Sequence, residues 1–298
     1  MRRALLVVIF LTNILFNPVF AQTNTIQKKL TELENSFDGR IGLYAINTAN
    51  HQKIEHRSQE RFPIQSTFKV LAVSAILKES ATTPNLLEQK MLFQNKDLVS
   101  NSPVTEKHIP DGMKISELCA AAIMYSNNTA TNLLLQKLGG PKNITAFARS
   151  IHDNQFRIDS WEPELNSDPH NIIDTSTPKA MAKSLQKLTL GNVLTAPSRD
   201  KLIQWMKDNT TGNTRIRAGV PQGWVVADKT GTGADYGISN DIAVIWPGKC
   251  SPLVMAIYTI QNKKDSVRRD EIIASVAHMV ADEFIKSDSC ISSIVGRA

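Results

Sequence analysis

The chain has 298 residues, of which 42% are hydrophobic and 21% are charged, and its formal net charge is +6. This length allows one large domain or two modest ones, and the composition excludes a disordered or collagen-like chain. No Lys/Arg block indicates a nucleic-acid-binding face, and three cysteines are too few for a disulfide-framework fold. The sequence therefore predicts a globular catalyst or small-molecule binder that has no nucleic-acid partner.

The first 21 residues have the features of a secretory signal peptide. Met1-Arg2-Arg3 is basic, Ala4 to Leu11 is an unbroken apolar run, and Val19-Phe20-Ala21 offers a cleavage site after Ala21. Beyond this segment no apolar run approaches the ~18 residues of a membrane-spanning helix. We therefore expect cleavage after Ala21, no membrane attachment thereafter, and a periplasmic or secreted location.

Hydrophobic periodicity predicts the elements of the mature chain in order. A helix is expected around residues 26–37, a β-hairpin at 40–47 and 53–56, and helices with breaks from 66 to about 207. Residues 153–177 form a long irregular segment, and loops of that length in compact domains are usually functional. Strands follow at 224–229, 242–246 and 253–260, with a final helix from about residue 266.

This order predicts an α/β (α+β) fold. The early hairpin and the three late strands most simply form one five-stranded antiparallel sheet, flanked by the terminal helices. Residues 22–57 and 208–298 then make the sheet domain, and residues 58–207 make an inserted all-helical domain that includes the 160–176 loop. A cleft is expected between the two domains. No exposed apolar stripe is obvious, so a monomer is the default.

A candidate nucleophile stands at the start of the helical region, where Ser66-Thr67-Phe68-Lys69 opens an apolar helical run. Residues at i and i+3 share a helix face, so the Lys69 nitrogen can reach the Ser66 oxygen and act as its base. The helix N-terminus also offers N–H groups to a developing oxyanion. By itself the pattern is weak, because S-x-x-K also begins at Ser176, Ser184 and Ser198.

Three further elements strengthen this interpretation. Ser126-Asn127-Asn128 is the only S-x-N in the chain, Lys229-Thr230-Gly231 is the only K-T-G, and Glu162-Pro163-Glu164-Leu165-Asn166 lies in the irregular loop. Each of the three also has a purely structural explanation: a helix end, a strand that leads into a turn, and a solvated acidic loop. Together, in this order and spacing, they resemble the class A serine β-lactamases. The resemblance extends over nearly all of the mature chain.

The resemblance implies a role for each matching catalytic residue. Ser66 would attack the lactam carbonyl and form an acyl-enzyme, with the oxyanion held by the backbone N–H groups of Ser66 and Thr232. Lys69 and Glu162 are both candidate bases for acylation, and the choice stays open. Ser126 would pass a proton to the departing ring nitrogen.

The same resemblance implies the substrate-binding residues. Asn128 matches the family's contact to the substrate amide, and Lys229, Thr230 and Gly231 match its site for the carboxylate beside the lactam. Arg215 matches an arginine that some members use for that carboxylate. The implied substrates are small-molecule β-lactams, with no cofactor.

Glu162 distinguishes between the possible functions of this site. An acylated serine is a stable ester, so a hydrolase must also activate water; Glu162 with Asn166 matches the family's water-holding pair. Only the resemblance, and not the spacing, selects Glu162 over Glu164. The alternatives are a D-Ala-D-Ala peptidase and a penicillin-sensing domain that acylates without turnover. Both would lack this carboxylate.

Some positions depart from the family pattern. Asn127 replaces the aspartate of S-D-N, which is expected to change only local hydrogen bonding. Ser160 replaces an arginine that pairs in many members with the position of Asp174. We therefore expect the Glu162 loop to be held more loosely, with weak amide-exchange protection across residues 161–174.

The cysteines and histidines complete the sequence evidence. A last strand of ~8–9 residues and a last helix of ~20 residues have similar lengths. A helix running back along the strand would bring Cys290 to Cys250, so a disulfide is expected there. Cys119 is expected to be a buried free thiol. The six histidines show no metal-ligand spacing, so no metal is predicted.

Overall fold

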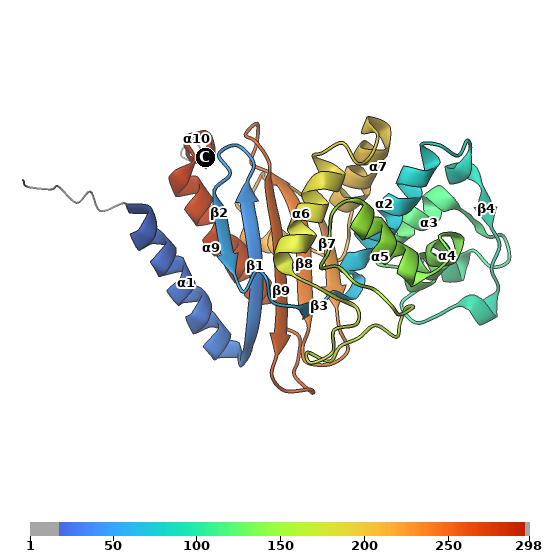
Figure 1. Cartoon of the computed structure of the whole chain (residues 1–298), viewed down its shortest axis with the longest axis horizontal. Coiled ribbons are helices and arrows are strands. Elements are labelled where there is room, and N and C mark those ends of the chain that lie inside the picture. Colours follow the sequence, from blue (N-terminus) through green and yellow to red (C-terminus); the bar gives the residue numbers. More distant parts are fainter. Residues whose placement is uncertain (1–17, 296–298) are drawn as a thin grey trace, which may run out of the picture.

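The computed structural model describes residues 18–295 of the chain, with side chains from Ile26 onward. Residues 1–17 of the predicted signal peptide lie outside the described residues, and so does the side chain of Ala21 at its expected cleavage site. A five-stranded antiparallel sheet in the order β2-β1-β9-β8-β7 forms the centre (Figure 1). Its strands are β1 (Gly39–Asn47), β2 (Lys53–His56), β7 (Val225–Thr232), β8 (Ser239–Trp246) and β9 (Leu253–Gln261).

Helices cover both faces of the sheet. Helices α1 (Pro18–Phe37) and α9 (Asp270–Ser287) pack on one face, and α6 (Pro178–Thr189) packs on the other (Figure 1). The other long helices gather on the β7 side of the sheet. They are α2 (Lys69–Ser80), α3 (Ile115–Met124), α4 (Asn128–Lys137), α5 (Pro141–Ser150) and α7 (Ala196–Lys207).

Short elements connect these layers. The two-stranded pairs are β3 (Phe62–Pro63) with β6 (Thr175–Ser176), and β4 (Lys90–Met91) with β5 (Met113–Lys114). The short helices are η1 (Gln65–Phe68), η2 (Leu86–Glu88), η3 (Asn95–Asp97), η4 (Thr105–Lys107), α8 (Ile216–Gly219) and α10 (Ser289–Val295).

Strand β9 shows why the late strands read as continuous apolar runs. Val254, Ala256 and Tyr258 belong to the core on the α6 side, whereas Met255 and Ile257 belong to the core under α1 and α9. Successive strand side chains point to opposite faces, so a sheet covered on both faces needs apolar residues at every position.

The α+β fold with a five-stranded antiparallel sheet, predicted from the sequence, is confirmed. The last long helix begins at Asp270 rather than near residue 266, and α10 follows it unpredicted. Asp288 immediately precedes α10 and caps its first turn: its Oδ1 accepts the N–H groups of Cys290 (2.9 Å) and Ile291 (3.2 Å). This side-chain cap is a local signal that hydrophobic periodicity does not reveal.

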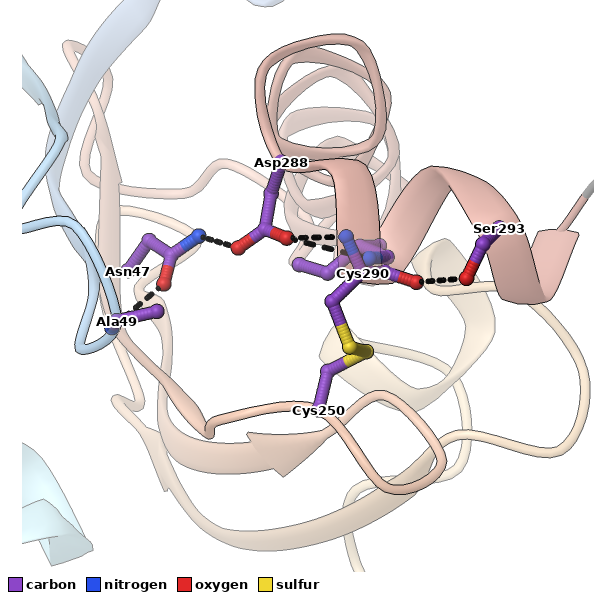
Figure 2. Close-up of a disulfide and its surroundings, with 7 residues drawn as sticks. Asn47, Ala49, Cys250, Asp288, Cys290 and Ser293 are labelled. Carbon is purple, nitrogen blue, oxygen red and sulfur yellow. Dashed lines mark hydrogen bonds between the residues drawn. A yellow bond between two sulfur atoms is a disulfide. The ribbon is translucent and has the colours of Figure 1, made fainter.

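A disulfide joins Cys250, in the turn between β8 and β9, to Cys290 on α10 (Figure 2). Asp288 ties the same region to the sheet, since its Oδ2 accepts Asn47 Nδ2 of β1 at 2.7 Å. The cross-link closes a loop with a sequence separation of 40 residues. Cys119 is a buried free thiol on α3, and burial raises its pKa.

Loss of this disulfide is expected to lower stability without touching catalysis. The Cys250→Ser/Cys290→Ser variant should lose about 2–4 kcal/mol of unfolding free energy, because its unfolded chain is no longer constrained. Calorimetry with and without reductant measures the effect, and the variant serves as the control because it should not respond to reductant. An unchanged melting temperature of the reduced wild type would contradict the prediction.

A second stability prediction concerns Glu34, which fastens α1 to the sheet edge. Burial alone would raise its pKa, but hydrogen bonds from His56, Arg57 and the Ile41 N–H lower it from 4.5 to about 2. A carboxylate with a depressed folded-state pKa stabilises the fold above its unfolded pKa of 4.5, and that stability is lost as the pH falls toward 2.

The Glu34→Gln variant should therefore lose about 3 kcal/mol of pH-dependent stability at pH 7 and much less near pH 2. Denaturant unfolding at several pH values gives the difference between wild type and variant. Glu32→Gln on the exposed side of α1 is the matched control. A Glu34→Gln deficit that stays constant from pH 7 to pH 3 would refute the assignment.

Candidate active site

Ser66 lies on η1, at the point where the chain enters α2. Thr67 fixes this turn from inside: its hydroxyl donates to Ile64 O (2.6 Å) and lies 3.0 Å from the Tyr258 hydroxyl of β9. Gly231 lets β7 approach the turn, because a Cβ there would lie 2.9 Å from Ile64 O. The sheet therefore supports the turn that presents Ser66.

A carboxylate and an ammonium group meet at Ser66. Ser66 Oγ donates to Glu162 Oε1 at 3.2 Å, and Lys69 Nζ lies 2.9 Å from the same oxygen. The Lys69 side chain is 0% exposed and that of Glu162 is 5% exposed. Burial lowers the pKa of Lys69, and the neighbouring Glu162 carboxylate opposes this shift. Among the described residues, the Ser66 hydroxyl bonds to Glu162 and not to Lys69, the base expected from the i, i+3 spacing.

Ser126 stands between two lysines. Lys229 Nζ donates to Ser126 Oγ at 3.1 Å, and Lys69 Nζ lies 3.3 Å from that oxygen. Lys69 also donates to Ser126 O (2.8 Å) and to Asn128 Oδ1 (2.6 Å). Burial holds the pKa of Lys229 well below its usual range, and the nearby Lys69 lowers it further. The Ser126 hydroxyl is thus placed to exchange a proton with either lysine.

Asn132 holds the backbone of Glu162 in both directions. Its Nδ2 donates to Glu162 O at 2.8 Å, and its Oδ1 accepts the Glu162 N–H at 3.0 Å. Sequence analysis missed this residue. A signal was present, because Asn128 and Asn132 stand at i and i+4 on α4 and share one face.

Asp174 closes the base of the Glu162 loop. The residue is fully buried; its Oδ1 accepts the N–H groups of Asp159 (2.7 Å) and Ser160 (3.1 Å), and its Oδ2 accepts that of Asn166 (3.1 Å). Three backbone donors therefore satisfy the Asp174 carboxylate, although Ser160 supplies no charged partner. This arrangement argues against the looser loop expected from Ser160.

The side chain of Asn166 makes hydrogen bonds to its own loop. Its Nδ2 donates to Ile173 O (2.9 Å) and Asp168 O (3.2 Å), and its Oδ1 accepts the Asp168 N–H (2.8 Å). These bonds stay within the loop, so the Asn166 side chain braces the loop.

Asn127, which stands where the family pattern has an aspartate, uses its side-chain oxygen to cap a helix, whereas its buried Nδ2 has no hydrogen-bond partner among the described residues. Asn127 is the N-cap of α4, and its Oδ1 accepts the Ala130 N–H (2.9 Å) and the Thr105 hydroxyl (3.1 Å). An amide oxygen caps a helix as well as a carboxylate does.

Arg215 braces the end of β7. Its Nη1 donates to Gly231 O (2.9 Å) and Asn240 O (2.7 Å), and its Nη2 donates to Thr232 Oγ1 (2.7 Å). Asp270 pairs with its Nε at 3.0 Å. Arg215 is 2% exposed, and burial lowers its pKa. Arg215 and Thr232 both line the cavity described below.

Asp228 on β7 and Asp241 on β8 are two buried carboxylates near Lys229. Neither was predicted from the sequence as a site residue. Asp228 accepts from Arg217 Nε and Asn209 Nδ2, and Asp241 Oδ2 accepts the Ile216 N–H (3.1 Å). Burial raises the pKa of both groups, and the nearby Asp228 raises that of Asp241 further. In their charged forms both carboxylates raise the pKa of Lys229 and so oppose the lowering by burial.

These groups open on one cavity of about 570 Å³. Ser66, Ser126, Asn128 and Glu162 line its floor, and Thr230, Thr232 and Arg215 line its β7 side. Tyr125, 40% exposed, also lines it, as does Asn101. The cavity therefore brings together the candidate nucleophile Ser66, the candidate base Glu162 and the charged residue Arg215, with Lys69 and Lys229 buried behind the lining.

The model of a family described as "Beta-lactamase enzyme family" matches residues 25–284. The chain belongs to the β-lactamase enzyme family. Its S-x-x-K, S-x-N and K-T-G motifs and the Glu162 loop make it a class A serine β-lactamase.

Relatives of this β-lactamase align over most of its length. It is 49% identical to β-lactamase OXY-2 of Klebsiella oxytoca, over 89% of this chain and 91% of the relative. It is 47% identical to β-lactamase Toho-1 of Escherichia coli, over 95% and 98%. A crystal structure of a β-lactamase from Desulfarculus baarsii DSM 2075 matches with a TM-score of 0.86 and 49% identity, covering 88% of this chain and 98% of that one.

Between residues 18 and 295, none of the helices combines the length and the apolar composition of a membrane-spanning segment. Within the same residues, no cluster of three or more His, Cys, Asp or Glu side chains could hold a metal ion.

Proposed function

We propose that this β-lactamase hydrolyses the β-lactam amide bond of penicillins and cephalosporins through an acyl-enzyme on Ser66. The observation that carries the proposal is the contact of Glu162 Oε1 with both Ser66 Oγ (3.2 Å) and Lys69 Nζ (2.9 Å). A carboxylate this close to the nucleophile can take its proton and later activate water against the ester.

The acylation step follows from the positions of these groups. Ser66 Oγ attacks the lactam carbonyl carbon while its proton leaves toward Glu162 or Lys69. The backbone N–H groups of Ser66 and Thr232 hold the oxyanion. The C–N bond then breaks, and Ser126 donates its proton to the ring nitrogen. Lys69 or Lys229 then returns a proton to Ser126.

The deacylation step depends on Glu162 alone. Glu162 takes a proton from a water molecule, and the hydroxide attacks the ester carbon. The bond between that carbon and Ser66 Oγ then breaks, and Glu162 returns the proton to Ser66 Oγ as it leaves. Lys229, Thr230 and Arg215 supply the positive and polar groups for the substrate carboxylate, and Asn128 supplies an amide for the substrate's side-chain amide.

Two other functions would use part of this site. A D-Ala-D-Ala peptidase or a penicillin sensor needs Ser66, Lys69, Ser126 and Lys229 but no carboxylate beside the ester. The contact of the Glu162 carboxylate with Ser66 Oγ favours hydrolysis, because it places a general base beside the ester, and Asn132 holds the backbone of Glu162 in that position.

The discriminating experiment mixes the purified mature protein with a chromogenic cephalosporin. Many turnovers per enzyme, with an adduct seen by intact mass only at early times, are expected. A single burst with a persistent adduct would assign the protein to the sensors instead.

Three further points belong to this proposal. The chain is exported with cleavage after Ala21 and works in the periplasm or outside the cell. Residues 22–57 with 208–298, and residues 58–207, form the two domains that border the cleft. The working unit is a monomer, and size-exclusion chromatography with light scattering tests this.

A further inference from the structure

Gln65 immediately precedes the nucleophile and is not part of the chemistry proposed above. Its side chain is buried, with the residue 5% exposed, and its backbone has φ = +46°, a left-handed conformation unusual for a side chain of this size. A buried amide in a strained position is costly unless its hydrogen bonds are used.

The Gln65 amide spans two walls of the cavity. Its Nε2 donates to Asn166 O at 2.8 Å and lies 3.3 Å from Ser167 Oγ, both on the Glu162 loop. On the other side it borders the end of β7, where a Cβ on Gly233 would lie 3.3 Å from Gln65 Nε2. The side chain of Gln65 therefore links η1 to the Glu162 loop.

The bond to Asn166 joins a wider set of contacts. The Asn166 N–H is held by Asp174 Oδ2, and Glu162, four residues earlier, is held by Asn132. Asn132 fixes the loop from the α4 side, and Gln65 fixes it from the side of the nucleophile. Among the described residues, Gln65 provides the side-chain hydrogen bonds that join residues 166 and 167 of the loop to η1, and a backbone bond from the Ile64 N–H to Asp174 O (2.9 Å) holds the end of the loop.

We propose that Gln65 is a positioning residue for deacylation, holding the Glu162 loop in register with Ser66. This inference rests on the proposed function. Acylation has Lys69 as a second base near Ser66, whereas in deacylation Glu162 acts alone on water. A small displacement of the loop therefore slows deacylation more than acylation.

Gln65→Met is the test, because methionine keeps the length and backbone preference of glutamine but removes the N–H donor. Loss of one hydrogen bond of this kind should slow deacylation about tenfold. The rate of adduct formation and kcat/KM should stay within about twofold of wild type, so kcat and KM fall together when deacylation limits turnover.

The readouts are adduct formation and adduct decay, followed by intact mass after rapid mixing, together with amide exchange at residues 166 and 167. Exposed Gln89→Met is the matched control, and Gln65→Asn, too short to reach Asn166 O, is the second variant should Gln65→Met fold poorly. Equal decay rates in wild type and both Gln65 variants would overturn the inference. So would a loss confined to adduct formation.

The same data separate this inference from the function on which it rests. Turnover by the wild type with a transient adduct on Ser66 supports the proposed function whatever the Gln65 variants do. A wild type that never releases its adduct would reject the proposed function itself.

Discussion

Glu162→Gln is expected to turn the enzyme into a protein that acylates and stops. Glutamine keeps the shape of the side chain and its backbone contacts to Asn132, but it cannot take a proton from water. General base catalysis contributes about 10²–10⁴-fold to a rate, so adduct decay should slow by that factor. Intact mass should show the adduct persisting for hours with a penicillin or a cephalosporin.

Two variants make this result specific. Glu164→Gln, two residues away and exposed, should turn over like the wild type. Ser66→Ala should form no adduct at all. Rapid adduct decay in Glu162→Gln would show that another group activates water, and the proposed assignment of Glu162 would fail.

Lys69→Met is expected to act on the preceding step. The variant removes an ammonium group that contacts Glu162 Oε1, Asn128 Oδ1 and Ser126 O, so proton transfer from Ser66 and to Ser126 loses its central donor and acceptor. We expect acylation to slow by about 10²–10⁴-fold. Burial, which lowers the pKa of Lys69, makes this amine a better base at neutral pH than an exposed lysine.

A structural effect has to be separated from this catalytic one. Removing one member of a buried ion pair leaves the other unpaired and costs about 3–5 kcal/mol of stability. The Lys69→Met/Glu162→Gln double variant removes both charges and should regain most of that stability, yet it should still acylate slowly. Exposed Lys183→Met is the control for the substitution itself. Acylation by Lys69→Met at the wild-type rate would leave Glu162 as the only base.

The sequence by itself determined the fold class and the residue types of the site. Apolar runs such as Leu253 to Ile260 can be recognised as strands in the sequence, because a strand that is buried on both faces does not alternate apolar and polar residues. The sequence also predicts Ser66, Lys69 and the K-T-G motif as site residues, because their chemistry depends on residue identity and on short spacings. These features are local, and a local pattern survives in the sequence.

The tertiary structure decided which groups touch. The Ser66 hydroxyl bonds to Glu162, a residue 96 positions away, and not to its helical neighbour Lys69. The side chain of Asn166 braces its own loop, while Asn132 and Gln65 hold that loop from two other elements. Such contacts join segments far apart in the chain, and only the packing of η1, α4 and β7 around one cavity sets their distances. No periodicity along the sequence carries that information.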